Sequence, residues 1–306
     1  MPINRLSSMS LGFTIGAGIC VLLPLGSSIA LSSEIEEWRA ETTIFKVGVV
    51  TGGDPLREKR LSQFGGYIQS ALNMPVDVFY AADTQRLIDA IAADQIDYAV
   101  MTGLSFAATQ KLCSCVRAIA SPSTIDGKTH IASVLLSPSS RQFEDIKRVI
   151  TGPSTDFSTH QVPKLAFETL VPDMTFDERH SLSAVLADLE IGDGQSVFAW
   201  TFTTVEQADP GGMNLSGFAE NVQQKLPDRS VKWMSQPYRL GPHVVHQTVP
   251  LEIRTKLTAA LASIREDSPL AFDAVSPMFG GPFVVADNAE YGNYSVLLDG
   301  FEESVD

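Results

Sequence analysis

A turn rich in hydroxyl groups is the part of the sequence best suited to binding chemistry. It spans residues 152–160, after a strand-like segment and before a helix-like one. Its side-chain donors are Ser154, Thr155, Ser158, Thr159 and His160. Free N–H groups at the start of a helix carry partial positive charge, so these groups and the hydroxyls together suit an oxyanion. Ordinary helix capping by a single Ser or Thr explains the same residues without a ligand, and both interpretations stay open.

Three further loops are expected near this turn. In an open α/β sheet the ligand crevice lies outside the carboxyl ends of the parallel strands. Residues 51–55, residues 102–106 and the end of the segment 196–201 each follow a strand pattern. The candidate contacts in these loops are Gly52, Thr102, Ser105, Phe106 and Trp200. For Trp200, packing in the core is an equally ordinary role for an aromatic side chain.

The elements that would position these loops alternate between strand and helix patterns. Alternating and β-branched apolar residues predict strands at 44–50, 76–79, 96–101, 131–136, 148–151 and 196–201. Apolar residues three and four apart predict helices at 56–72, from 83, at 158–170, at 180–191 and at 251–265, the last of which is expected to close the fold. This order predicts an α/β fold of two units, each a mostly parallel sheet covered by helices.

Composition and motifs exclude several classes of protein. The chain of 306 residues has a formal net charge of −14 and no basic run longer than residues 57–60, so nucleic acid and anionic lipid are not expected partners. Ser105 follows Gly103 but lacks the second glycine of a nucleophile elbow, and Gly52 belongs to no complete phosphate-binding loop. No metal-ligand spacing or dinucleotide fingerprint is present. We therefore expect binding without catalysis, and neither a metal nor a cofactor.

The first thirty residues have the pattern of a secretory signal peptide. Residues 11–25 are almost entirely apolar, and Ser28 and Ala30 place small residues at positions −3 and −1 of a cleavage site. A retained anchor through residues 11–25 is the alternative, but this run is short for a membrane span and contains Pro24. Cleavage would leave Cys113 and Cys115, either as two thiols at a helix end or as a local disulfide in an oxidising compartment.

Five segments in order resemble one known family. They are KVGVVTGGDP (46–55), LIDAIAADQIDYAVMTGLSF (87–106), THIASVLLSP (129–138), RVITGPSTDFSTHQVPKLAFETL (148–170) and FGGPFVVADNAEY (279–291). These segments resemble the phosphate-, phosphite- and phosphonate-type substrate-binding proteins of ABC importers. The resemblance implies a type II periplasmic-binding-protein fold, with one ligand between two lobes and two crossover strands as the hinge. It implies a first lobe at 42–133 plus 238–306, and a second lobe at 134–237.

The departures from the family pattern concern the ligand site. Family members commonly read Ser-Ser-Thr-Ser-Gly-His/Tyr at the turn, and an ungapped comparison places Asp156 and Phe157 opposite two of the hydroxyl residues. It places Phe106 and Ile131 where the family usually has tyrosines. The retained donors are Ser105, Ser133, Ser158 and His160. We therefore expect a more apolar pocket, in which Asp156 would repel an anion if its carboxylate pointed inward.

The resemblance implies a periplasmic function. The expected protein captures a small ligand, a phosphorus oxyanion such as phosphonate, phosphite or phosphate, and delivers it to an ABC permease in the inner membrane. The ligand would join the loops of the first lobe to the helix start at residues 158–160 and favour the closed state by contacts that are absent when the lobes are open. The alternative is a periplasmic sensing or adaptor protein that uses the same fold and moves no solute.

Overall fold

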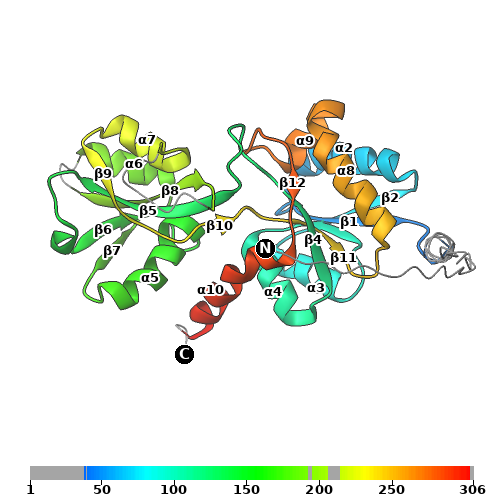
Figure 1. Cartoon of the computed structure of the whole chain (residues 1–306), viewed down its shortest axis with the longest axis horizontal. Helices are drawn as coiled ribbons and strands as arrows, with labels where there is room; N and C mark the ends of the chain where they lie inside the picture. The colour runs from blue at the N-terminus through cyan, green and yellow to red at the C-terminus, as the bar shows by residue number, and fades with distance from the viewer. Residues whose placement is uncertain (1–37, 39, 192–194, 206–213, 304–306) are drawn as a thin grey trace, which may run out of the picture.

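The chain folds into two α/β lobes that lie side by side along the long axis of the molecule (Figure 1). The computed structural model describes residue 38 and residues 40–191, 195–205 and 214–303. The expected signal peptide at residues 1–30 lies outside these described residues. Among the described helices, none is long and apolar enough to cross a membrane.

The first lobe is built on a sheet with the strand order β12-β4-β11-β3-β1-β2. Its strands are β1 (Phe45–Val50), β2 (Val76–Ala81), β3 (Tyr98–Val100), β4 (Val116–Ser121), β11 (His243–His246) and β12 (Val284–Val285). The central strand β1 pairs in parallel with β2 and with β3. The carboxyl ends of these three strands therefore meet at one edge of the sheet, where loops converge.

Helices cover both faces of this first sheet. They are α2 (Pro55–Leu72), α3 (Thr84–Ala92), α4 (Gly103–Cys113), α8 (Leu251–Asp267), α9 (Pro269–Val275), the 3-10 turn η4 (Asn288–Tyr291) and α10 (Gly292–Glu303). On one face α2, α8 and α9 bury Phe64, Leu257 and Phe272 against β1. On the other face α3, α4 and α10 share a second apolar cluster that contains Phe106 and Tyr294.

The second lobe repeats this arrangement on a second sheet, with the strand order β10-β5-β8-β6-β7 and β9 paired to β5. Its strands are β5 (His130–Pro138), β6 (Arg148–Thr151), β7 (Thr175–Glu178), β8 (Ser196–Thr203), β9 (Arg229–Met234) and β10 (Tyr238–Arg239). Its helical segments are η1 (Phe143–Asp145), the π-helical turn η2 (Phe157–Gln161), α5 (Val162–Leu170), α6 (Leu182–Ile191) and α7 (Gly217–Lys225).

Alternate residues of β5 face opposite sides of the second sheet. Val134 packs in the cluster formed by α6 and α7, whereas Leu135 packs against Phe167 of α5. By the two-residue period of a strand, Ser133 and Ile131 share the face of Leu135, which is the face covered by α5 and η2. This assignment places Ser133 beneath the hydroxyl-rich turn.

Helix α2 illustrates how local sequence sets these elements. The predicted apolar positions Leu61, Phe64 and Ile68 are all buried, because three- and four-residue spacing places them on one side of the helix. Asp54 caps the start by accepting the Leu56 N–H, and Asn73 ends the helix in a left-handed conformation. The predicted helix at 56–72 is thereby confirmed to within one residue.

Other predictions needed correction. The helix at 251–265 does not close the fold, because α9, β12, η4 and α10 follow it. Residues 103–106 form the first turn of α4 rather than a loop, since Thr102 provides a helix cap. The mostly parallel sheets also contain antiparallel pairs, such as β11 with β3 and β5 with β8, because β11 and β5 enter from the crossovers between lobes. Of the two alternatives for the cysteines, the structure has a disulfide between Cys113 and Cys115.

Candidate functional site

The start of α4 is the first-lobe part of the candidate site. Thr102 Oγ1 accepts the Ser105 N–H at 3.1 Å, and Ser105 Oγ accepts the Thr102 N–H at 2.8 Å. The two neutral hydroxyls thus form a reciprocal capping box that holds the loop after β3. Thr102 is exposed and Ser105 is buried. Both predicted contacts therefore take part in the helix cap, and of the two only Thr102 is an exposed residue.

The hydroxyl-rich turn after β6 is capped by a carboxylate of the chain itself. Asp156 Oδ1 accepts the Ser158 N–H at 3.1 Å, the Thr159 N–H at 2.8 Å and the Thr159 hydroxyl at 2.7 Å. Gly152 allows this arrangement, because a Cβ at that position would overlap Thr159 Oγ1. The interpretation as a helix cap therefore applies here, with Asp156 rather than a Ser or Thr as the acceptor.

The remaining predicted donors of the turn have different surroundings. His160 is buried, and its Nδ1 lies 3.1 Å from Thr151 Oγ1. Thr155 is exposed, and no hydrogen bond of its side chain is found among the described residues. Ser133 is only 1% exposed, and its Oγ has no partner among the described residues. His160 is therefore bonded within the core, whereas the buried Ser133 hydroxyl of β5 has no partner among the described residues.

Aromatic side chains fill the region where the two lobes meet. Phe157 of η2 lies 5.2 Å from Tyr238 of β10 and 5.4 Å from Tyr294 of α10, measured between ring centroids. A Cβ at Gly103, the first residue of α4, would overlap the Tyr294 ring. Phe106 packs on Tyr291 at 5.0 Å in the same cluster. Rings from η2, β10 and α10 thus connect the start of η2 to the start of α4.

The phenols of this cluster bind the crossover strand. The Tyr294 hydroxyl donates to the backbone carbonyl of Arg239 at 2.6 Å, and the Tyr291 hydroxyl donates to that of Leu240 at 3.0 Å. Burial raises the pKa of both Tyr291 and Tyr294 above the ordinary value for a phenol, so both hydroxyls stay protonated donors. The C-terminal segment therefore holds the crossover strand β10 by hydrogen bonds as well as by packing.

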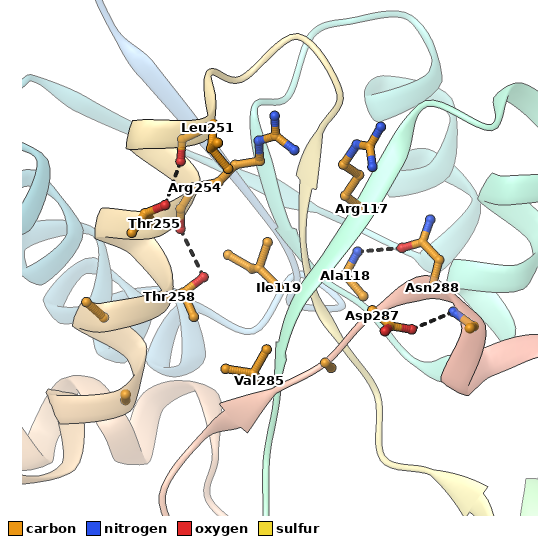
Figure 2. Close-up of a pocket in the computed structure, with 14 residues that line it drawn as sticks. Arg117, Ala118, Ile119, Leu251, Arg254, Thr255, Thr258, Val285, Asp287 and Asn288 are labelled. Atoms are coloured by element: carbon orange, nitrogen blue, oxygen red, sulfur yellow. Dashed lines mark hydrogen bonds between the residues drawn. The ribbon is translucent and has the colours of Figure 1, made fainter. Parts of the chain in front are cut away.

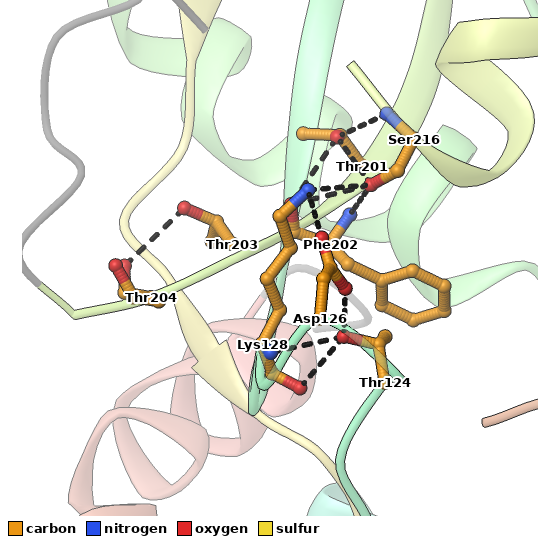
Figure 3. A network of polar contacts seen from close by, with 8 residues as sticks. All are labelled: Thr124, Asp126, Lys128, Thr201, Phe202, Thr203, Thr204 and Ser216. Atoms are coloured by element: carbon orange, nitrogen blue, oxygen red, sulfur yellow. Dashed lines mark hydrogen bonds and ion pairs between the residues drawn. The ribbon is translucent and has the colours of Figure 1, made fainter. Parts of the chain in front are cut away.

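A polar network near the end of β8 makes a second contact between the lobes (Figure 3). Lys128 lies in the crossover before β5, and its Nζ is 3.1 Å from Asp126 Oδ2 and 3.4 Å from Ser216 Oγ, which belongs to the second lobe. This cation is thus already paired with a carboxylate. Trp200 lies within β8 rather than at its end, and it packs over Gly217 and Phe202 as part of the α7 cluster.

A small pocket lies at the carboxyl ends of β1 and β3. Its volume is about 290 Å³, and its walls include Val50, Thr102, Thr84, Val275 and Arg57. Arg57 lies in the first turn of α2, is exposed, and has no hydrogen bond or ion pair with another described residue. A cation in the first turn is unfavourable to the helix dipole, so helix stability does not explain it. Gly52, another predicted contact, is exposed in the neighbouring loop with a φ of +64°.

A larger pocket of about 800 Å³ lies elsewhere on the first lobe, between α8 and the edge formed by β4 and β12. Figure 2 shows Arg117, Arg254 and Thr258 along this pocket, together with the hydrogen bond from the Ala118 N–H to Asn288. None of the predicted ligand contacts lines it. It also lies away from the carboxyl ends of β1 and β3, where a ligand is expected in an open α/β sheet.

Comparison with known protein families shows which family this chain belongs to. Residues 47–291 match the family described as "ABC transporter, phosphonate, periplasmic substrate-binding protein". The chain belongs to this family. The expected resemblance is thereby confirmed, and the chain is a periplasmic binding protein of the phosphonate ABC transporter class rather than a member of an enzyme family. No curated protein sequence matches the chain.

Solved structures of other proteins are similar to this chain in fold. A binding protein component of an ABC phosphonate transporter from Pseudomonas aeruginosa has 13% identity and a TM-score of 0.51, over 83% of this chain and 85% of that one. PhnD1 from Prochlorococcus marinus, in complex with methylphosphonate, has 13% identity and a TM-score of 0.53, over 85% and 98%. A Xanthomonas citri protein bound to chloride ion has 10% identity and a TM-score of 0.58, over 86% and 98%. The two-lobe fold expected from the sequence is confirmed.

Sequence reasoning missed three contributions to the site region. The acceptor role of Asp156 depends on the direction of a side chain at the start of a π-helical turn, which a sequence pattern does not contain. Arg57 was treated only as part of a short basic run. Neither Tyr294 nor α10 was predicted. The three-residue spacing of Tyr291, Tyr294 and Leu297, which are all buried, is the sequence signal that indicates this helix. The family match ends at residue 291, just before α10 begins.

Proposed function

We propose that this protein captures a small phosphorus oxyanion, such as a phosphonate, phosphite or phosphate, and delivers it to an ABC permease. The family match over residues 47–291 supports the transport role. PhnD1, which shares the fold, was solved with methylphosphonate, and this supports the ligand class. No feature of the described residues favours the alternative of a sensing or adaptor protein. An exported chain in the periplasm is consistent with this role, with residues 1–30 as its signal peptide.

The pocket beside Arg57 is the observation that carries the ligand assignment. Its position at the carboxyl ends of β1 and β3 is where ligands bind in open α/β sheets. Its volume of about 290 Å³ suits a small solute rather than a nucleotide or peptide. The guanidinium of Arg57 offers paired N–H donors that match the oxygens of a phosphonate or phosphate. Thr102, an exposed residue whose hydroxyl belongs to the neutral cap of α4, lines the same pocket.

Closure of the two lobes is the proposed mechanism of capture. An anion held by Arg57 and Thr102 would bring its remaining groups toward the second lobe, where Ser158 and Thr155 follow β6. Contacts made only in the closed state shift the population toward that state. The crossover before β5 and the strand β10 are the segments about which the lobes would turn.

Ligand titration of the purified exported chain tests this function. Phosphate, phosphite, methylphosphonate and 2-aminoethylphosphonate are compared with sulfate and with amino acids by calorimetry and thermal shift. A phosphorus oxyanion at 100 times its dissociation constant is expected to stabilise the protein by about 2.7 kcal/mol. Arg57→Ala is expected to weaken binding by about tenfold or more, because it removes a charge-assisted hydrogen bond.

Arg60→Ala is the matched control for this titration. It removes the same charge from the same helix but lies outside the pocket at β1 and β3. The control is expected to retain the affinity of the unaltered chain. The proposal fails if none of the phosphorus oxyanions binds, or if the two arginine variants lose affinity equally.

A further inference from the structure

One carboxylate oxygen in the second lobe takes the two backbone N–H donors and one hydroxyl at the start of the helical run that follows β6. Asp156 Oδ1 lies within 3.1 Å of the Ser158 and Thr159 nitrogens and within 2.7 Å of Thr159 Oγ1. Two backbone N–H groups and a hydroxyl around one oxygen form the kind of cradle that binds an oxyanion at the start of a helix. Here η2 continues directly into α5, so the helical run extends from Phe157 to Leu170.

A ligand oxyanion has no place on this turn while Asp156 stays there. The same N–H groups cannot serve two acceptors at full strength, and two negative oxygens at short range repel each other. To reach the turn, the ligand would first have to displace the Asp156 side chain. The apparent affinity of the turn for an anion is reduced in proportion to the fraction of molecules in which Asp156 is displaced.

A buried hydroxyl without a partner lies on the side of the second sheet that carries the same turn. Ser133 is 99% buried, so its Oγ is inaccessible to solvent. This oxygen forms no hydrogen bond within the described residues. By strand alternation its side chain is on the face of β5 that η2 and α5 cover, because Leu135 on that face packs against Phe167. An unpaired buried hydroxyl is uncommon and costly, so it indicates hydrogen-bonding capacity that the chain itself leaves unused.

We propose that Asp156 is a specificity-determining residue whose carboxylate replaces the ligand anion in the second lobe. The inference rests on the proposed function, in which the solute is a phosphorus oxyanion. In this protein the anionic end of the solute is held on the first lobe beside Arg57, and the second lobe rejects it. Removal of the Asp156 carboxylate opens a second anion position, formed by the N–H groups of Ser158 and Thr159 with the Ser133 hydroxyl behind them.

The variant Asp156→Ser separates the charge from the cap. Serine is also a good N-cap residue, so the helical run keeps a capping side chain. Asp156 is half-buried, so the space left by the carboxylate connects to solvent. The variant is expected to bind methylphosphonate about tenfold or more tightly than the unaltered chain, because the repelling charge is removed and a neutral hydroxyl holds the N–H groups less strongly than a carboxylate does. Asp156→Asn, which removes the charge but keeps an acceptor oxygen, is expected to gain less.

Two further variants make the test specific. Asp287→Ser removes an aspartate that caps η4 by accepting the Ala289 N–H at 2.8 Å, and it changes the net charge equally. Its affinity for methylphosphonate is expected to stay unchanged. The double variant Asp156→Ser with Ser133→Ala is expected to lose part of the gain, which a purely global charge effect would not produce.

Calorimetric titration of these variants with methylphosphonate decides the inference. A gain in Asp156→Ser that Asp287→Ser does not show supports it. The inference is overturned if a folded Asp156→Ser chain binds methylphosphonate equally well or more weakly than the unaltered chain. If the serine variant does not fold, the same comparison is made with Asp156→Asn. Wild-type binding that depends on Arg57, without any gain in the Asp156 variants, overturns this inference and leaves the proposed function standing. Binding only by Asp156→Ser supports the exclusion of the anion by Asp156, and it overturns the proposed ligand of the unaltered chain together with its position beside Arg57.

Discussion

Two helix starts face the contact between the lobes, and they differ in what caps them. The start of α4 in the first lobe is capped by Thr102 and Ser105, which are neutral and bond to each other. The start of η2 in the second lobe is capped by Asp156, which brings a full negative charge to the same position relative to the helix. Both starts follow a parallel strand, and both carry hydroxyl residues.

The difference shows what a hydroxyl-rich turn does and does not indicate. Such a turn supplies donors, but an anion binds only where no carboxylate of the chain has already taken them. In the first lobe the exposed Arg57 lies beside the neutral cap, whereas in the second lobe the donors of Ser158 and Thr159 are satisfied internally. The second turn is richer in hydroxyls, yet the first lobe offers the better surroundings for an anion.

The largest expected effect concerns the ring that joins the two helix starts. Tyr294→Ala removes the contacts with Phe157 and with Gly103, and loss of a buried aromatic ring costs about 3–5 kcal/mol of stability. Tyr294→Phe is the control, because it keeps the ring and loses only the bond to the Arg239 carbonyl, about 1 kcal/mol. Urea denaturation measures both. If the two variants were equally stable, the ring would not join the lobes as described.

A smaller effect is expected from filling the space at the start of α4. Gly103→Ala places a methyl group against the Tyr294 ring, and overpacking of this kind costs about 1–3 kcal/mol. Gly66→Ala in α2 is the matched control, because nothing lies within 4 Å of the added Cβ, and alanine favours a helix by about 1 kcal/mol. Thermal denaturation is expected to shift in opposite directions for the two variants. A shift in the same direction would contradict the close approach of α10 to α4.

Much of the fold follows from local patterns in the sequence. The spacing of Leu61, Phe64 and Ile68 is enough to predict α2, and the rule for parallel strands is enough to place residues 51–55 and Thr102 at the same edge of the first sheet. These inferences succeed because each depends on residues close together in the chain. The family resemblance adds the order of the lobes, which no local pattern contains.

The surroundings of the site were less predictable, because they depend on contacts between distant residues and on side-chain directions. Tyr294 meets Gly103 only after both lobes and the crossovers are in place. Asp156 was expected to repel an anion if it pointed inward, and the structure has it bonded to the turn itself. His160 fitted an anion donor equally well, but its ring nitrogen faces the Thr151 hydroxyl in the core.

The crystal structure of the complex with methylphosphonate tests the account most directly. The account predicts phosphonate oxygens within hydrogen-bond distance of the Arg57 guanidinium and the Thr102 hydroxyl, with the Asp156 carboxylate still accepting from Ser158 and Thr159. Phosphonate oxygens on the N–H groups of Ser158 and Thr159, with the Asp156 side chain turned away and Arg57 free, would contradict it.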